Sequence, residues 1–376
     1  MQLLRSLQRH SWALAVTGVF VVQNHCGMPG IEHSQLAVHL LERGQFERAL
    51  REARRAVRED AQDSNMRVVT ALAEAGLGRY EQSVGALAGA LRRDPNDVRI
   101  YSTLRSLCGQ QDCAEIALGA LQELSRTVED NWYVQANLGW AWAINDDPDQ
   151  ALILLEEAVG DLPPEVDESE QIFAHRQLSR LYLDTERFAD AARVLEGALM
   201  LRPQDPRLLI GIGECQLREG EEDGAQIYFE RALEAAENTV ETASLIAQVH
   251  YNTGLPRRAI QYYEVAAQQR LVTPLILNNL AWTYAEEGIG LERAEDLSLR
   301  AVKADAVNVV YLDTYAEVQF RQGRTGRAIA LMKRAIALEP EGGEHFEYLR
   351  GQLVRFESES ALNALGESGL GRSPDG

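Results

Sequence analysis

The residue types that most often bind metals or act as nucleophiles do not form a recognisable site in this sequence. Four of them crowd the N-terminus, His25, Cys26, His33 and His39, but no two of them have the three- or four-residue spacing of metal ligands on one helix face. The sequence also lacks a phosphate-binding glycine loop, a dinucleotide-binding fingerprint, a His-Glu-x-x-His motif and a Cys-x-x-Cys pair. Aspartates and glutamates are abundant, but nothing marks a pair as general acid and base. We therefore expect no enzyme, no metal and no cofactor.

Two cysteines offer a different chemistry. Cys108 and Cys113 flank a predicted turn, with four residues between them. In an oxidising compartment such a pair could close a disulfide, whereas in the cytosol both would be small buried residues. Cys215 falls at a small-residue position, and we expect it to be packed.

Composition sets the class of protein. The chain has 376 residues, with 57 acidic against 37 basic side chains and a net charge of −20. Non-specific nucleic-acid binding needs a basic surface, so this charge argues against it. Apolar residues make up 45% and charged residues 25%, which is typical of a folded chain. Ala, Leu, Glu and Arg dominate without alternating β-branched runs, which predicts an all-α protein.

The N-terminus predicts export. Arg5 and Arg9 precede an unbroken apolar run over residues 12–22. As a helix this run would span roughly 17 Å, against the ~30 Å hydrocarbon core of a bilayer, so it fits a secretory signal better than a spanning helix. Residues 1–29 are therefore predicted to be a signal or anchor segment, and Cys26 after the apolar run resembles the lipidated cysteine of a bacterial lipoprotein. Three alternatives stay open: a periplasmic lipoprotein, a signal left uncleaved or cleaved unusually, and an N-terminal helix kept in the cytoplasm.

A 34-residue period runs through the chain. Small residues recur at Ala49, Ser83, Ala117 and Ala151, and again at Ala191, Ala225 and Ala259. Glycines precede them at Gly44, Gly78, Gly220, Gly254, Gly288 and Gly323, and prolines close units at Pro95, Pro163, Pro203 and Pro340. The pattern resembles the tetratricopeptide repeat, best in Leu138-Gly139…Trp142…Ala151…Leu155…Ala158…Pro163. Nine units are predicted, at residues 30–63, 64–97, 98–131, 132–165, 172–205, 206–239, 240–273, 274–308 and 309–342.

The resemblance implies an all-α, right-handed superhelical solenoid of helix-turn-helix repeats. Each unit reads as two amphipathic helices joined at a residue that needs a positive φ, which glycine supplies. We expect repeats one to four over residues 30–165, an acidic linker at 166–171 and repeats five to nine over 172–342. A capping helix at 343–357 and a disordered tail at 358–376 complete the prediction.

In this family the first helices line a concave groove that binds extended peptides or partner helices. The positions predicted to face the groove are Arg99, Tyr133, Asn137, Trp140, Phe173, Arg176, Arg180, Arg207, Tyr251, Asn279, Trp282, Asp313, Glu317, Phe320 and Arg321. Asn137 and Asn279 match a position at which the family often binds a ligand backbone. The lysine-rich clamp for a C-terminal carboxylate is absent, so a partner of the chaperone-adaptor type is not expected.

Two of these groups have an alternative role. Trp140 and Trp282 could instead fill the space between helices. Arg176, Arg180 and Arg207 form a predicted cationic wall suited to an acidic or C-terminal segment, and the alternative is pairing with neighbouring acids such as Glu214.

The prediction that follows is a non-catalytic protein-interaction scaffold. We expect an exported, envelope-associated assembly factor that binds a partner segment in the groove and touches the membrane only through its N-terminus. Bacterial pilus-assembly lipoproteins and polysaccharide-secretion scaffolds offer fold-level analogies. A self-assembling coat protein and an accessory subunit of an enzyme encoded nearby remain alternatives, and the oligomeric state stays open.

Overall fold

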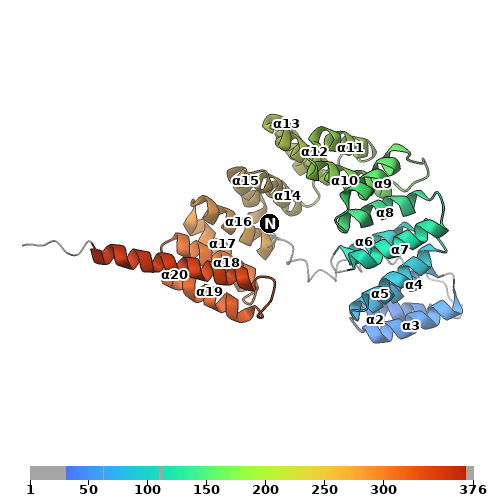
Figure 1. Cartoon of the computed structure of the whole chain (residues 1–376), viewed down its shortest axis with the longest axis horizontal. Coiled ribbons are helices and arrows are strands. Elements are labelled where there is room, and N and C mark those ends of the chain that lie inside the picture. Colours follow the sequence, from blue (N-terminus) through green and yellow to red (C-terminus); the bar gives the residue numbers. More distant parts are fainter. Residues whose placement is uncertain (1–30, 62, 110–112, 370–376) are drawn as a thin grey trace, which may run out of the picture. The chain divides into compact units, whose positions relative to one another are not determined.

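The computed structural model describes residues 31–61, 63–109 and 113–369. Cys26 and the rest of the predicted signal segment lie outside these residues. Every regular element in the described part is a helix, and the helices up to α19 form nine consecutive pairs (Figure 1). The all-α prediction and the repeat architecture are confirmed.

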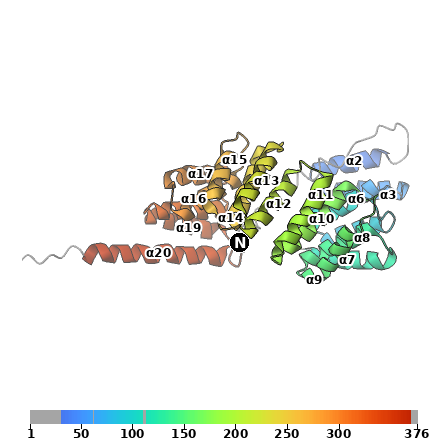
Figure 2. The ribbon, with the colours of Figure 1, turned by 90° about the horizontal axis from the view of Figure 1, so that it is seen from above.

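The helix bounds follow the predicted period. The first helices of the pairs are α2 (Ile31–Glu42), α4 (Ser64–Gly76), α6 (Val98–Cys108), α8 (Trp132–Ile144), α10 (Glu168–Asp184), α12 (Pro206–Glu219), α14 (Thr239–Asn252), α16 (Pro274–Glu287) and α18 (Val309–Arg321). The second helices are α3 (Phe46–Glu59), α5 (Tyr80–Leu91), α7 (Ala114–Thr127), α9 (Pro148–Gly160), α11 (Phe188–Leu201), α13 (Glu222–Glu234), α15 (Pro256–Ala267), α17 (Leu291–Ala304) and α19 (Thr325–Leu338). A last helix, α20 (Phe346–Gly369), packs against α19 and is seen lengthwise in Figure 2.

The chain divides into two compact units between Pro203 and Gln204. The N-terminal unit holds α2 to α11, and the C-terminal unit holds α12 to α20. Within each unit the two helices of a pair pack on each other and on the next pair. A pair alone cannot bury its apolar face, so each stack forms one continuous core.

Local sequence signals begin and end the helices. From α4 onward, every first helix starts after a residue whose side chain accepts a hydrogen bond from a backbone N–H of the first turn. These caps are Asp63, Asp97, Asn131, Asp167, Asp205, Asn238, Thr273 and Asn308. The six recurring turn glycines all have positive φ, as expected. In the fourth and fifth pairs the same conformation falls on Asp146 and Glu186, each with φ of 59°.

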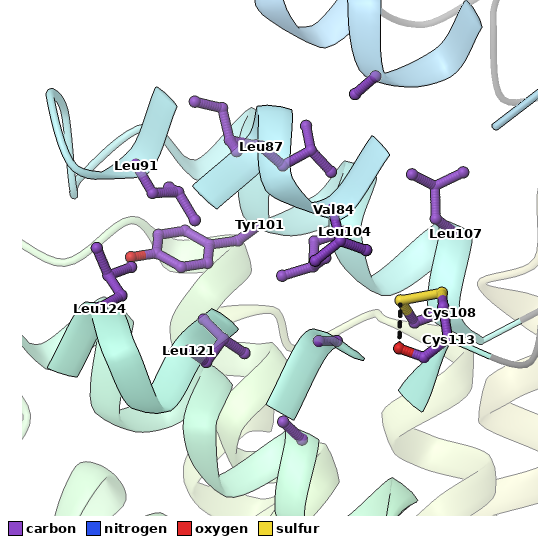
Figure 3. Close-up of a cluster of buried hydrophobic side chains, with 14 of the residues drawn as sticks. Val84, Leu87, Leu91, Tyr101, Leu104, Leu107, Cys108, Cys113, Leu121 and Leu124 are labelled. Carbon is purple, nitrogen blue, oxygen red and sulfur yellow. Dashed lines mark hydrogen bonds between the residues drawn. A yellow bond between two sulfur atoms is a disulfide. The ribbon is translucent and has the colours of Figure 1, made fainter. Parts of the chain in front are cut away.

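Small residues allow the two helices of a pair to approach closely. A Cβ atom added at Gly139 would lie 2.8 Å from Leu155 Cγ, which is closer than carbon atoms pack. Ala49, Ala117 and Ala151, each near the start of a second helix, are fully buried. Figure 3 shows how larger side chains fill the space between neighbouring helices, with Tyr101 among the leucines of α5, α6 and α7.

Two predicted boundaries are wrong. The segment 166–171 is not a linker throughout, because α10 begins at Glu168, where Asp167 caps the helix and two acidic residues favour its first turn. The capping helix does not end at residue 357, because α20 continues to Gly369 through a stretch that includes the helix formers Ala361 and Leu362. The predicted tail is therefore helical over residues 358–369.

A candidate partner-binding surface

A buried charge network joins three first helices of the N-terminal unit. Arg105 on α6 donates to Glu170 on α10 at 2.6 Å and to the Oδ1 atom of Asn137 on α8 at 2.6 Å. The Glu170 side chain is 4% exposed and the Arg105 side chain 14%. The Nδ2 atom of Asn137 donates to the Tyr133 carbonyl at 2.8 Å. Both the oxygen and the nitrogen of the Asn137 side-chain amide are therefore hydrogen-bonded within the chain and not directed to a ligand.

Beside this network, α10 presents an aromatic ring and two cations. The Arg105 guanidinium lies over the Phe173 ring, 3.9 Å from its centre, so the half-buried ring is held in place. Arg176 and Arg180 follow Phe173 at helical spacing and share its face of α10. Both arginines are exposed, and the Arg180 guanidinium lies 4.0 Å from Asp184 with 74% of its side chain accessible. This group of three residues is called the α10 face below.

The other predicted residues of this unit serve the fold. Tyr133 stacks on Tyr101, with ring centres 6.3 Å apart, and its hydroxyl accepts the Asp167 N–H at 3.0 Å. Trp140 belongs to the core and is 5% exposed, which corresponds to the packing alternative. Arg99 binds its own helix cap, and it also donates to Ser64 and Asn65 at the start of α4.

In the C-terminal unit the structure brings together two predicted residues, Tyr251 and Trp282. Trp282 Nε1 donates to the Tyr251 hydroxyl at 3.1 Å, and this hydroxyl donates to Glu286 at 2.7 Å. Burial, reinforced by the bond to Glu286, raises the pKa of Tyr251 to about 12. Asn279 hydrogen-bonds Tyr263 on α15. The side chains of Tyr251, Trp282 and Asn279 are partly exposed, but each forms a hydrogen bond within the unit.

Arg207 belongs to the C-terminal unit and pairs with an acid, as in the alternative role, but the acid is not Glu214. It donates to Glu241 at 2.5 Å, one repeat further along the chain. Glu214, the acid predicted for this role, binds Arg218 at 3.2 Å. Because Arg207 lies in the other compact unit, the α10 face consists of Phe173, Arg176 and Arg180 alone.

The helix α20 contacts Asp313, Glu317 and Phe320, whereas Arg321 binds Glu317 on its own helix at 2.7 Å. Arg355 of α20 binds Glu317, and the Phe356 ring stacks on Phe320 at 4.4 Å. Tyr348 hydrogen-bonds Asp313, whose burial beside Glu317 raises its pKa to about 7. Sequence reasoning missed this contact, although Tyr348, Arg355 and Phe356 recur at helical spacing and mark one face of the helix.

The two cysteines at the α6–α7 turn lie together. The structure joins Cys108 and Cys113 as a disulfide, with Cα atoms 5.0 Å apart and both side chains buried (Figure 3). Cys215 is fully buried, and burial raises the pKa of its thiol to about 12, which makes it unreactive.

The described residues offer neither a metal-binding cluster nor a helix suited to cross a membrane. Among them, no group of three or more His, Cys, Asp or Glu side chains is placed to hold a metal ion. None of the described helices combines the length and apolar character needed to cross a membrane.

Comparison with known proteins agrees with the helix pairs. Two tetratricopeptide-repeat family models match residues 34–98 and 182–249. Tetratricopeptide repeat protein 8 of Caenorhabditis elegans is 24% identical over 34% of this chain and 25% of its own length. Tetratricopeptide repeat protein 17 of Danio rerio is 24% identical over 39% of this chain and 12% of its own length. The chain thus spans a quarter or less of these curated relatives.

The chain also aligns with a solved structure. A tetratricopeptide repeat protein from Parabacteroides merdae aligns with 68% of this chain and 98% of its own, at 14% identity and a TM-score of 0.45. Arrays of this kind typically bind protein partners. The nine helix pairs, the turn and packing residues and the two matching family models show that the chain is built of tetratricopeptide repeats.

Proposed function

We propose that this protein is a non-catalytic scaffold that binds an acidic segment of a partner protein on the α10 face. The scaffold is exported and tethered to the cell envelope by its N-terminal segment, where it serves assembly of a larger complex. The proposal combines the repeat fold with a predicted groove surface that presents two exposed arginines beside an aromatic ring.

The observation that carries the proposal is the contrast between the α10 face and the other predicted groove residues. Asn137 and Trp140 are buried, and Arg99 is bound at a helix start. Arg176 and Arg180 are exposed on α10, with the Arg180 guanidinium 4.0 Å from Asp184, on a chain of net charge −20. Two guanidinium groups next to a half-buried ring suit the carboxylates and apolar side chains of an acidic peptide, and Arg and aromatic residues are common in binding hot spots.

Export is supported by the sequence of the first residues. Arg5 and Arg9 precede the short apolar run, and Cys26 follows it. In the native host, the substitution Cys26→Ser should release the protein into the soluble fraction if the cysteine is lipidated. Full-length protein found soluble in the cytoplasm would refute the tether.

The binding proposal is tested with a partner captured by crosslinking from native membranes and identified by mass spectrometry. We expect the double substitution Arg176→Ala and Arg180→Ala to weaken binding at least tenfold, about 1.4 kcal/mol. Binding by the native protein should also weaken as salt rises. Normal affinity in the double variant would refute the α10 face as the binding site.

A charge-matched control separates this surface from general electrostatics. Arg92 and Arg93 are exposed at the end of α5, in the same unit but not on α10. The double substitution Arg92→Ala and Arg93→Ala removes the same charge and should leave affinity within about twofold. Circular dichroism should give the same helical content for both variants, because loss of structure in the α10 variant would show that its arginines are structural.

A further inference from the structure

A row of arginines follows the outer side of the first helix pair. Arg48, Arg51, Arg55 and Arg58 on α3 have the spacing of residues that share one face of a helix. All four are exposed. Ala49, Ala53 and Ala56, which are buried, occupy the opposite face and pack into the repeat core. The four residues are called the α3 arginine stripe.

The fold neutralises only part of this stripe. Arg48 binds the uncharged Gln45, and Arg55 binds Glu52, which His33 also contacts at 2.6 Å. Within the residues that the structure describes, Arg51 and Arg58 form no ion pair. The flanking acids on this helix are Glu47 and Glu59, which border the stripe without pairing with it.

The positive charge is local to this end of the unit. The helix α3 has five arginines against three glutamates. In the other second helices of the N-terminal unit, acidic residues outnumber basic ones. A cationic surface at one end of an otherwise acidic stack can meet an anionic surface while the acidic repeats extend beyond the ~8 Å screening length of physiological salt.

The length of the N-terminal segment indicates what that surface is. Only residues 23–30 separate the apolar run, which ends at Val22, from the start of α2 at Ile31. Even fully extended, such a segment reaches about 30 Å. If the apolar run or Cys26 is held in a membrane, the first helix pair must stay close to the lipid headgroups, at a high effective concentration.

We propose that the α3 arginine stripe binds the phosphate groups of anionic phospholipids and so holds the first helix pair against the membrane surface. The inference rests on the tether in the proposed function. Guanidinium groups bind phosphate oxygens with paired hydrogen bonds, and basic residues next to a membrane anchor are attracted to anionic headgroups. Nucleic acid offers phosphates as well, but a free polyanion would meet the whole charge of −20 without a tether.

The test measures how fast phenylglyoxal modifies individual arginines of the full-length protein in vesicles, with mass spectrometry as the readout. One set of vesicles is phosphatidylcholine alone, and the other contains about 30% phosphatidylglycerol. We expect modification of Arg51 and Arg58 to slow at least fivefold in the anionic vesicles and to recover in 0.5 M NaCl. The exposed Arg270 and Arg327 of the C-terminal unit should react equally in both.

Two charge-matched variants sharpen the result. Arg51→Glu with Arg58→Glu should abolish protection of Arg48 and Arg55 in anionic vesicles. Arg270→Glu with Arg327→Glu changes the net charge by the same amount and should leave protection of the stripe intact. Loss of protection in both variants would show an effect of net charge and would overturn the proposal.

The remaining outcomes separate the stripe from the tether. Equal modification rates in both vesicles, with the protein bound to both, would overturn the stripe and leave the tether standing. Failure to bind either vesicle would overturn both. Protection that rises with protein concentration alike in both vesicles would assign the stripe to a second copy of the chain, and protection by added RNA without vesicles would assign it to nucleic acid; either would overturn the lipid proposal.

Discussion

Gly213 on α12 lies directly against the ring of Phe229 on α13. A Cβ atom built at Gly213 would be 2.5 Å from the Phe229 Cε1 atom. The Phe229 side chain is fully buried, so it has little space into which to move. The absence of a side chain at residue 213 therefore sets how closely the sixth helix pair packs.

We expect Gly213→Ala to destabilise the C-terminal unit by about 1–3 kcal/mol, because either the ring or the helices must shift. Urea unfolding followed by circular dichroism measures this. Gly351→Ala on α20 is the control, since a Cβ atom there meets nothing within 4 Å. This control should stabilise the unit slightly by raising helix propensity, and equal behaviour of the two variants would contradict the packing argument.

At the turn of the fifth pair, a substitution to glycine should raise the stability instead of lowering it. Glu186 is exposed and has φ of 59° at a position where most other pairs have glycine. We expect Glu186→Gly to stabilise the N-terminal unit by about 1 kcal/mol, because left-handed backbone is costly for residues with a Cβ atom. Thermal unfolding measures the change. Gly254→Ala reverses the exchange at the equivalent turn, where φ is 78°, and should destabilise.

His250 predicts a dependence of stability on pH. Its ring stacks on Tyr262 at 5.1 Å between centres, contacts Phe229 and is 4% exposed, with neither ring nitrogen hydrogen-bonded. Burial, with a smaller contribution from Arg258, lowers the pKa of His250 to about 4. The unfolded chain should titrate near the ordinary value of about 6.5.

Between these two values the unfolded state binds a proton that the native state does not. Stability should therefore fall as pH drops from about 6.5 towards 4, by about 2 kcal/mol at pH 5. His250→Leu removes the titrating group and should flatten this part of the profile of unfolding free energy against pH. An unchanged slope in the variant would assign the dependence to other groups, among them His175, whose pKa burial also lowers.

The Cys108–Cys113 pair gives a prediction for exported protein. Closing this short loop should stabilise the third helix pair by about 2 kcal/mol, chiefly by restricting the unfolded chain. Mass analysis without reductant should show two hydrogens fewer than in the reduced protein. Two free thiols in protein isolated from the native envelope would contradict the bridge there.

Most of the fold could be predicted from the 34-residue period of the sequence. Alanines, turn glycines and closing prolines report backbone geometry, so they placed the helix pairs. Whether a residue is free to bind a partner depends on which other segments pack over its helix. The repeat period carries no information about those contacts. Asp313 and Glu317 occupy groove positions in the pattern, but Tyr348 and Arg355 of α20 bind them.

Glu170 shows why the local composition gave a wrong prediction for the segment around it. Surrounded by acids and prolines, it reads as part of a solvated loop, although it is 3% exposed and paired with a residue 65 positions earlier. A contact across that distance leaves no local trace in the sequence. Asn137 matches a ligand-binding position of the family, but its Oδ1 atom accepts a hydrogen bond from Arg105, which the pair with Glu170 holds in place.

This buried pair supplies the last prediction. Glu170→Ala should destabilise the N-terminal unit by about 3 kcal/mol, because Arg105 would remain buried without its carboxylate. Replacing both partners, Arg105→Met with Glu170→Leu, removes both charges and should cost less than the single change. Urea unfolding of Arg105→Met, of Glu170→Leu and of the double variant gives the coupling energy between the two residues.

Hydrogen exchange along α10 then locates the effect. Amides from Glu170 to Arg180 should lose protection in Glu170→Ala, because the ion pair fixes the first turns of this helix against α6. The C-terminal unit should be unaffected. If the two substitutions instead acted independently, with the double variant losing the sum of the single effects, Arg105 and Glu170 would not be energetically coupled. The α10 face would then depend on apolar packing around Phe173 alone.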